Sequence, residues 1–105
     1  MDYTSPMVEI RKSETYEQWF RKLKDRQAQA RINARLRRIA DSGNFGDVKS
    51  IRDGVSELRV DCGPGYRVDF VQRGSVLVIL LAGGDKRTQD ADIKAAIKVL
   101  KDWKD

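Results

Sequence analysis

Two short segments of alternating polarity, separated by a glycine-proline turn, constrain the fold of this chain most. Apolar and charged residues alternate from Val55 to Asp61, and again from Tyr66 to Phe70. Between them lies Gly63-Pro64-Gly65, a sequence typical of a tight hairpin loop. We therefore expect an antiparallel β-hairpin that has one apolar face and one charged face.

A loop of three residues also predicts which residues of the hairpin face each other. On the apolar face the expected pairs are Val60 with Val68 and Leu58 with Phe70. On the charged face they are Asp61 with Arg67 and Arg59 with Asp69. Each pair of opposite charges is favourable by roughly a few tenths of a kcal/mol, and a slip of one residue would mix the two faces.

Helices are expected before the hairpin. The segment from Thr15 to Lys24 carries its aromatic side chains on one helical face, and Ser13 or Thr15 can cap it. Asp25 can cap a second helix that runs to about Ala40. Short strands are expected at the ends of this region, from Met7 to Arg11 and from Val48 to Ile51.

A strand and a helix are expected after the hairpin. The unbroken apolar run from Val76 to Ala82 predicts a central strand that is covered on both faces, and Gly83-Gly84 is expected to end it. A closing helix runs from about Asp90 to Trp103. The whole order predicts an α+β domain in which a helical hairpin packs on a twisted antiparallel sheet of about four strands with a C-terminal helix.

Length and composition favour one cytoplasmic domain. The chain has 105 residues, which suits a single domain over residues 1–105. Its one cysteine, Cys62, excludes an internal disulfide and fits a reducing cytosol. The first residues lack the apolar core of a signal peptide, and the longest apolar run is too short to cross a bilayer. We therefore expect no membrane association.

The residue types limit the possible chemistry. The chain has no histidine and one cysteine, so it cannot form a Ser-His-Asp or Cys-His nucleophile system. Asp85, Asp90 and Asp92 lie close in sequence, but they lack the glycine and the final glutamate of a calcium loop. We interpret them as loop and helix-start carboxylates. Neither a metal nor a cofactor is expected.

A group of basic residues remains as a candidate binding site. Arg59 and Arg67 are expected on the same polar face of the hairpin, and Lys86 and Arg87 follow the next strand. Guanidinium groups suit phosphate because they donate paired hydrogen bonds in a plane. The alternative is that Arg59 and Arg67 only pair with Asp69 and Asp61 across the hairpin. The formal net charge of +5 fits a polyanionic partner, but it equally fits a merely soluble basic protein.

The second helix also carries cations. Arg31, Arg35 and Arg38 lie away from its apolar stripe, which Ile32, Leu36 and Ile39 form. These arginines could contact RNA or an acidic partner, or they could be a solvated helix surface. The spacing alone does not separate these alternatives.

Several motifs together resemble a known family. They are Glu57-Leu58-Arg59, Gly65-Tyr66-Arg67, Gly83-Gly84-Asp85-Lys86 with Gln89, Asp92 and Ile93, and the segment from Trp19 to Asp47. In this order and spacing they resemble the HigB-like addiction module killer proteins of the RelE/ParE toxin superfamily. The resemblance implies a RelE-like α+β fold. Many members cleave mRNA in the ribosomal A site without a metal, because the 2′-hydroxyl attacks the neighbouring phosphate.

The resemblance also implies roles for individual residues. Arg67 matches the arginine that holds the scissile phosphate, while Arg59 and Lys86 match basic positions beside it. Asp85 could orient a cation or a hydroxyl. Glu57 stands where the RelE branch has a lysine and could serve as a base, and Asp92 stands where that branch has a tyrosine. The further RNA-binding residues that we expect are Arg87, Lys49, Arg31 and Arg35.

The same resemblance implies partners and leaves two other functions open. HigB-like toxins pair with a small helix-turn-helix antitoxin, HigA-like here, and reach operator DNA only through it. The mRNA on the ribosome would be the target. However, fold does not fix activity in this superfamily, because the ParE branch inhibits DNA gyrase. The alternatives are therefore a gyrase inhibitor and a non-toxic RNA- or protein-binding module.

Overall fold

A computed structural model describes residues 7–104 of the chain. In chain order its elements are β1 (Glu9–Lys12), α1 (Glu14–Lys22), α2 (Arg26–Ser42), β2 (Val48–Arg52), β3 (Val55–Val60), β4 (Tyr66–Arg73), β5 (Leu77–Asp85), a 3-10 turn (Lys86–Thr88) and α3 (Gln89–Asp102). None of the helices in this described part is both long and apolar enough to cross a membrane.

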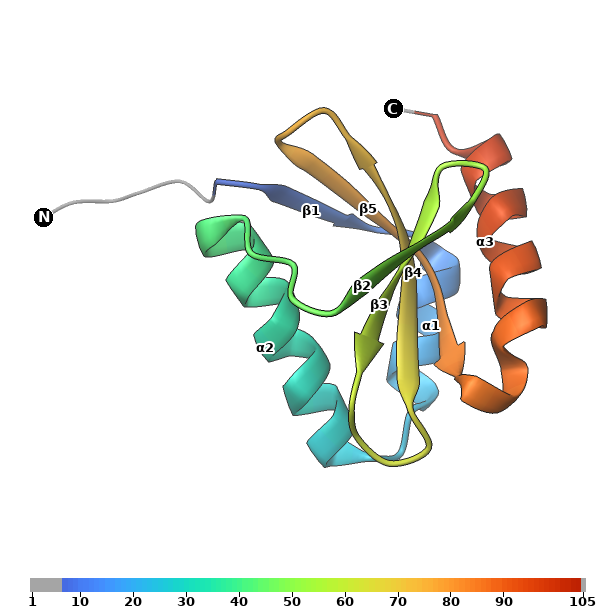
Figure 1. Ribbon diagram of the computed structural model, residues 1–105. Helices are drawn as coiled ribbons and strands as arrows, with labels where there is room; N and C mark the ends of the chain where they lie inside the picture. Colours follow the sequence, from blue (N-terminus) through green and yellow to red (C-terminus); the bar gives the residue numbers. More distant parts are fainter. Residues whose placement is uncertain (1–6, 105) are drawn as a thin grey trace, which may run out of the picture.

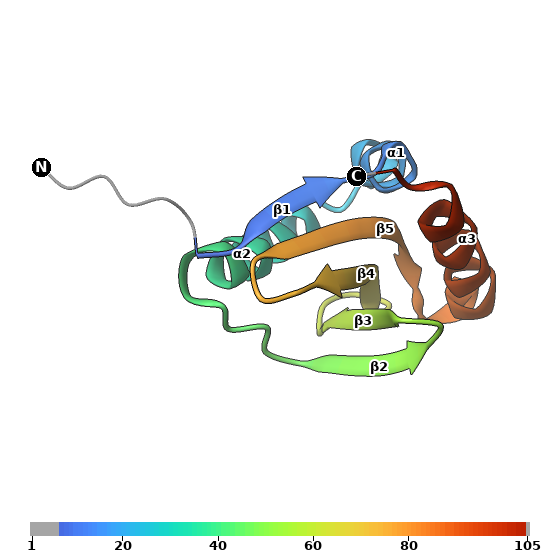
Figure 2. The same ribbon diagram turned by 90° about the horizontal axis from the view of Figure 1, so that it is seen from above.

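The strands form one mixed sheet in the order β1-β5-β4-β3-β2, as Figure 2 shows. The four consecutive strands β2 to β5 are antiparallel, which confirms the predicted antiparallel sheet of about four strands. The strand expected near the N-terminus joins them as a fifth and runs parallel to β5. β5 is therefore an interior strand, and most of its residues are buried, as the apolar run predicted.

Helices cover both faces of this sheet. α2 lies on one side and α3 on the other (Figure 1). One core cluster joins α1 and α2 to Leu58, Val68 and Leu80 of the sheet. A second cluster joins Ala96 of α3 to the opposite face, around Leu81. The predicted α+β architecture is confirmed, with the C-terminal helix on the face away from the helical hairpin.

The helix ends follow the expected capping chemistry. The Ser13 hydroxyl accepts a hydrogen bond from the amide of Tyr16, so Ser13, and not Thr15, caps α1. The Asp25 carboxylate caps α2 by accepting from the amide of Ala28. Gly43 ends α2 in the left-handed region, at a φ of 74°, where glycine carries no steric cost.

The expected end of β5 is wrong. Gly83 and Gly84 do not stop the strand, which continues through them to Asp85. A Cβ on Gly83 would overlap the indole of Trp19, and a Cβ on Gly84 would overlap the carboxylate of Asp92. Glycine is required here because α1 and α3 both approach the backbone of β5 closely.

The predicted register of the hairpin is wrong by two residues. Leu58 pairs with Val68, and Arg59 pairs with Arg67. Asp61 and Cys62 leave the ladder together with the glycine-proline turn, which lengthens the loop. A shift of two residues keeps every side chain on its predicted face, but it replaces the expected pairs of opposite charge by pairs of like charge.

Candidate nucleic-acid interface

The charged face of the hairpin carries two cross-strand rows on the side of the sheet that α3 covers. The row nearest the hairpin loop runs through Asp47, Arg59, Arg67 and Gly84, where Asp47 accepts the backbone hydrogen bond of Arg59. The next row runs through Lys49, Glu57, Asp69 and Ala82. Arginine thus faces arginine in one row, and carboxylate faces carboxylate in the other.

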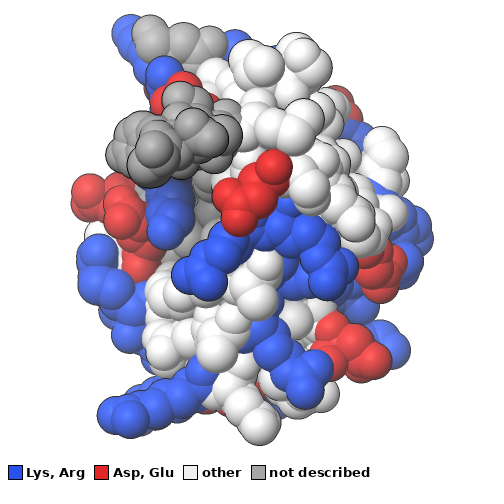
Figure 3. Space-filling model, turned by 90° about the vertical axis from the view of Figure 1, so that its left-hand side faces the viewer, with Lys and Arg blue, Asp and Glu red and all other residues white. Residues whose placement is uncertain are grey.

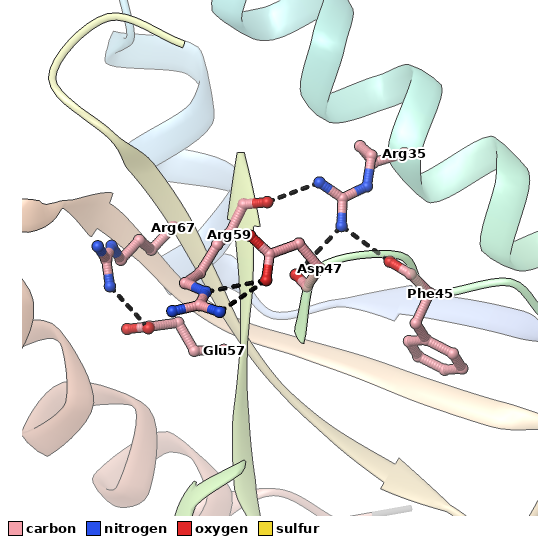
Figure 4. Close-up of polar contacts among 6 residues, drawn as sticks. All are labelled: Arg35, Phe45, Asp47, Glu57, Arg59 and Arg67. Atoms are coloured by element: carbon pink, nitrogen blue, oxygen red, sulfur yellow. Dashed lines mark hydrogen bonds and ion pairs between the residues drawn. The ribbon is translucent and has the colours of Figure 1, made fainter. Parts of the chain in front are cut away.

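Each arginine pairs with a carboxylate instead, Arg67 diagonally across the two rows and Arg59 within its own row (Figure 4). Nη1 of Arg67 lies 2.8 Å from Oε1 of Glu57, across the two rows. Nη2 of Arg59 lies 2.7 Å from Oδ1 of Asp47, before the start of β2. The predicted pairs, Asp61 with Arg67 and Arg59 with Asp69, are wrong because the register differs. Both arginines are ion-paired, as the alternative interpretation expected, but the partners that it named, Asp69 and Asp61, are wrong, because the carboxylates are those of Asp47 and Glu57.

The Glu57 carboxylate is buried, and both of its oxygens have partners within the protein. Its side chain is 1% exposed, against 17% for Arg67. Besides the ion pair, its Oε2 accepts a hydrogen bond of 2.9 Å from the Gln89 side chain at the start of α3. Both carboxylate oxygens are therefore engaged inside the protein. The expectation that Glu57 serves as a general base on a substrate finds no support in this geometry.

Asp69 is the other buried carboxylate. Burial, and then the nearby charges of Glu57 and Asp92, raise the pKa of Asp69 to about 7, while Arg67 opposes the rise. The alternating pattern placed Asp69 on the charged face of the hairpin, but α3 covers that face at Asp69. Sequence reasoning missed this residue because the pattern shows which face a side chain takes and not what packs on that face.

An open groove of about 340 Å³ lies at the hairpin end of the sheet. Its lining residues are Asp47, Arg59, Val60, Asp61, Gly65, Tyr66 and Arg67. Lys86 borders the groove, because a Cβ built on Gly65 would lie 3.8 Å from Cβ of Lys86. The three cations expected to act together, Arg59, Arg67 and Lys86, are therefore gathered at one end of the sheet.

Asp85 and Arg87 form a local pair beside this groove. Oδ1 of Asp85 accepts the backbone hydrogen bond of Arg87 at 2.8 Å and caps the 3-10 turn. Oδ2 lies 3.0 Å from Nη2 of Arg87, whose side chain is 79% exposed. Hydrogen bonds from Arg87 lower the pKa of Asp85. Asp85 thus orients a cation, and Arg87 keeps its side chain in solvent.

The arginines of α2 divide into two kinds. Arg31 is exposed, and cations spread over the face that α2 presents (Figure 3). Arg35 instead turns inward and donates hydrogen bonds to the backbone carbonyls of Arg59, Phe45 and Asp47 (Figure 4). Its guanidinium therefore fastens α2 to the sheet, and its expected role in binding RNA finds no support in these contacts.

A second, smaller hollow continues the groove towards α2. Its lining residues are Arg31, Ala34, Arg35, Arg38, Val60 and Asp61. It shares Val60 and Asp61 with the groove at the hairpin end. Exposed cations of α2 therefore lie beside the groove. Lys49 is exposed on the edge strand β2, opposite Glu57 and further from the hairpin loop.

Tyr66 is a groove residue that sequence reasoning left out of the site. Its ring packs edge-on against Trp19 at 6.4 Å between centroids, and its hydroxyl donates to Asp25 at 3.5 Å. Burial and the neighbouring Asp25 raise the pKa of Tyr66. The Gly65-Tyr66-Arg67 motif could have pointed to Tyr66 as a site residue, but the alternating pattern indicated only that Tyr66 faces the core.

Asp92 occupies a structural position. It accepts a hydrogen bond from Thr88 in the first turn of α3 and lies against Gly84. Burial raises its pKa. Asp90 and Asp92 are helix-start carboxylates, as expected. Within residues 7–104 no group of three or more His, Cys, Asp or Glu side chains is arranged to hold a metal ion.

Comparisons with known proteins show one family and one fold. The family described as "Phage derived protein Gp49-like (DUF891)" matches residues 18–104. An uncharacterised protein of Haemophilus influenzae is 54% identical over 89 residues, which are 85% of this chain and 89% of that protein. A free mutant of the E. coli toxin RelE has a TM-score of 0.62 at 14% identity and covers 87% of this chain and 97% of its own. A chain of the intact E. coli RelBE toxin-antitoxin complex has a TM-score of 0.61 at 16% identity. The match covers 74% of this chain and 95% of that chain.

Proposed function

Because this chain belongs to the Gp49-like (DUF891) family and has the fold of the toxin RelE, we propose that it is the toxin of a type II toxin-antitoxin pair. Within that class we place it in the HigB-like branch, as an mRNA endoribonuclease that acts on the ribosome in the cytoplasm. The implied partners are mRNA and a HigA-like helix-turn-helix antitoxin, through which alone it reaches operator DNA.

The observation that carries this proposal is the gathering of three cations at the groove at the hairpin end. Arg59 and Arg67 line it, and Lys86 borders it. Planar guanidinium groups match the oxygens of a phosphodiester, and the lysine adds a point charge. Exposed arginines of α2 extend the positive surface beyond the groove. A strand of RNA is the polyanion that best fits such a groove.

Cleavage in this groove needs no metal ion. The 2′-oxygen attacks the neighbouring phosphorus and the bond from phosphorus to the 5′-oxygen breaks, which leaves a cyclic phosphate and a free 5′-hydroxyl. Arg59 and Arg67 stabilise the charge that grows on the phosphate oxygens. The exposed Asp61 carboxylate accepts the proton of the attacking hydroxyl in place of the occupied Glu57, and Lys86 protonates the leaving oxygen.

The proposal is tested by expressing the chain in cells without its antitoxin. We expect growth arrest and new mRNA 5′ ends at fixed positions within codons. Arg59→Ala should abolish both effects, because this exposed side chain lines the groove. Arg52→Ala is the matched control, because Arg52 is an exposed arginine at the other end of β2, where it pairs with Asp53.

Two other outcomes would overturn the nuclease proposal. Growth arrest with intact transcripts and an SOS response would indicate a gyrase inhibitor. Harmless expression of a well-folded protein would indicate a non-toxic binding module. Co-expression with the HigA-like antitoxin that the proposal implies should restore growth, and failure of that rescue would contradict the toxin-antitoxin assignment.

A further inference from the structure

Behind the groove lies a cluster of largely buried charges, of which the proposed cleavage uses only Arg67. We call it the acidic cluster and define it as Glu57 on β3, Arg67 and Asp69 on β4, and Asp92 on α3. Glu57 and Asp69 face each other directly across the two strands and are 0% and 1% exposed. The neighbour of Asp69 on β5 is Ala82, so that strand adds no charge here.

Two atoms of the acidic cluster are left without a partner. Among the described residues, Oδ1 of Asp69 and Nε of Arg67 are both buried without a hydrogen bond. They belong to residues of opposite charge that lie two apart on the same face of β4. A buried polar atom without a partner costs free energy, so each of these groups gains if the other moves towards it.

Arg67 belongs both to the acidic cluster and to the groove. One of its terminal nitrogens binds Glu57, while the residue also lines the groove. An ionised Asp69 places a second negative charge beside Glu57. It therefore attracts the guanidinium inward and also repels an anion in the groove. A protonated Asp69 has neither effect.

We propose that Asp69 is a positioning residue that acts through Arg67: when ionised it holds the guanidinium within the acidic cluster, and when protonated it leaves the guanidinium to the groove. The inference rests on the proposed function in one respect, namely that the groove binds RNA phosphate. Linkage then requires the reverse effect, so that bound RNA favours the protonated form of Asp69.

The composition of the chain makes the titration of Asp69 easy to separate from that of other groups. The chain has no histidine, which is the side chain that ordinarily titrates near neutrality. The pKa of Asp69, at about 7, lies in that range. Asp69→Asn keeps the shape of the side chain and removes the titration. Any pH dependence that persists in Asp69→Asn comes from another group.

The first test measures the affinity of a single-stranded RNA oligonucleotide at constant salt. Between about pH 6 and about pH 8, wild-type affinity should fall roughly fivefold, as expected for one added charge near the groove. Asp69→Asn should bind tightly with little pH dependence. Equal pH dependence in the two proteins, or none in the wild type, would overturn the inference.

The second test needs no ligand. The nitrogen chemical shift of Arg67 Nε is followed across the same pH range in the free protein. It should titrate in the wild type with a midpoint near that of the Asp69 carboxyl carbon, and stay constant in Asp69→Asn. If it titrates in this way but RNA does not bind at any pH, the proposed function fails and the coupling of Asp69 to Arg67 stands. A constant shift in the wild type would overturn the coupling itself.

Discussion

Substitution of Arg35 tests whether this arginine holds α2 on the sheet or belongs to the RNA-binding surface. Its guanidinium donates to the carbonyl oxygens of Arg59 at 2.6 Å, Phe45 at 2.8 Å and Asp47 at 3.2 Å. Hydrogen bonds from a charged donor contribute about 1 kcal/mol or more each when partly exposed, and the longest one contributes least. Arg35→Ala should therefore lower the free energy of unfolding by about 2–3 kcal/mol.

Urea denaturation followed by circular dichroism measures this loss. The midpoint should fall in Arg35→Ala while the dependence on urea stays unchanged. Arg31→Ala is the matched control, because Arg31 is exposed on the same helix, and it should shift stability by less than about 0.5 kcal/mol. Arg35→Lys keeps the charge without the planar fork and should recover less than half of the loss. Equal midpoints for Arg35→Ala and Arg31→Ala would refute the structural role of Arg35.

Four further predictions follow from the site. Arg67→Ala leaves the buried Glu57 carboxylate without its ion pair and should cost about 3 kcal/mol in urea denaturation, most of which a combined Glu57→Gln and Arg67→Met variant recovers; an unchanged midpoint in the single variant would contradict the buried pair. Gly84→Ala places a Cβ against Asp92 and Thr88 and should cost about 2 kcal/mol, so an unchanged melting curve would show that α3 does not dock there. The pKa of Asp69 is raised in the folded protein from 3.8 to about 7, so the folded state binds this proton more tightly and the contribution of Asp69 to stability falls as pH rises between these values; Asp69→Asn should match the wild type in acid and be the more stable protein at about pH 8, by a few kcal/mol, and a pH-independent difference between the two would refute the assignment. Lys86→Ala should reduce the slope of log affinity for RNA against log salt by about 1, whereas Lys98→Ala on α3 should leave it unchanged.

The helices and the central strand could be predicted because local chemistry determines them. Asp25 caps α2, and Gly43 ends it, through contacts within a few residues of each helix end. The apolar run around Leu80, which ends at two glycines, favoured a strand covered on most of both faces. The gathering of Arg59, Arg67 and Lys86 at one end of the sheet also follows from strand order, which the alternating pattern already indicated.

Other features depend on contacts between distant segments and could not be predicted. The two glycines after Ala82 looked like a strand end, and only the packing of Trp19 and Asp92 explains why the strand needs them. The charged face looked solvated, yet α3 buries Glu57 and Asp69 on it. The register error arose because complementary charges favoured the wrong pairing, whereas in the structure Arg67 pairs diagonally with Glu57 and Arg59 pairs with Asp47 in its own row.

The most direct test of the central claim uses purified ribosomes that carry a defined mRNA and an empty A site. Addition of the wild-type protein should cut the mRNA within the A-site codon and leave a 5′-hydroxyl on the downstream fragment. The combined Arg59→Ala and Lys86→Ala variant should bind the ribosome weakly and cut at least a hundredfold more slowly, which is about 2.7 kcal/mol in the barrier. Intact mRNA with the wild-type protein, or equal cutting by the variant, would contradict the account.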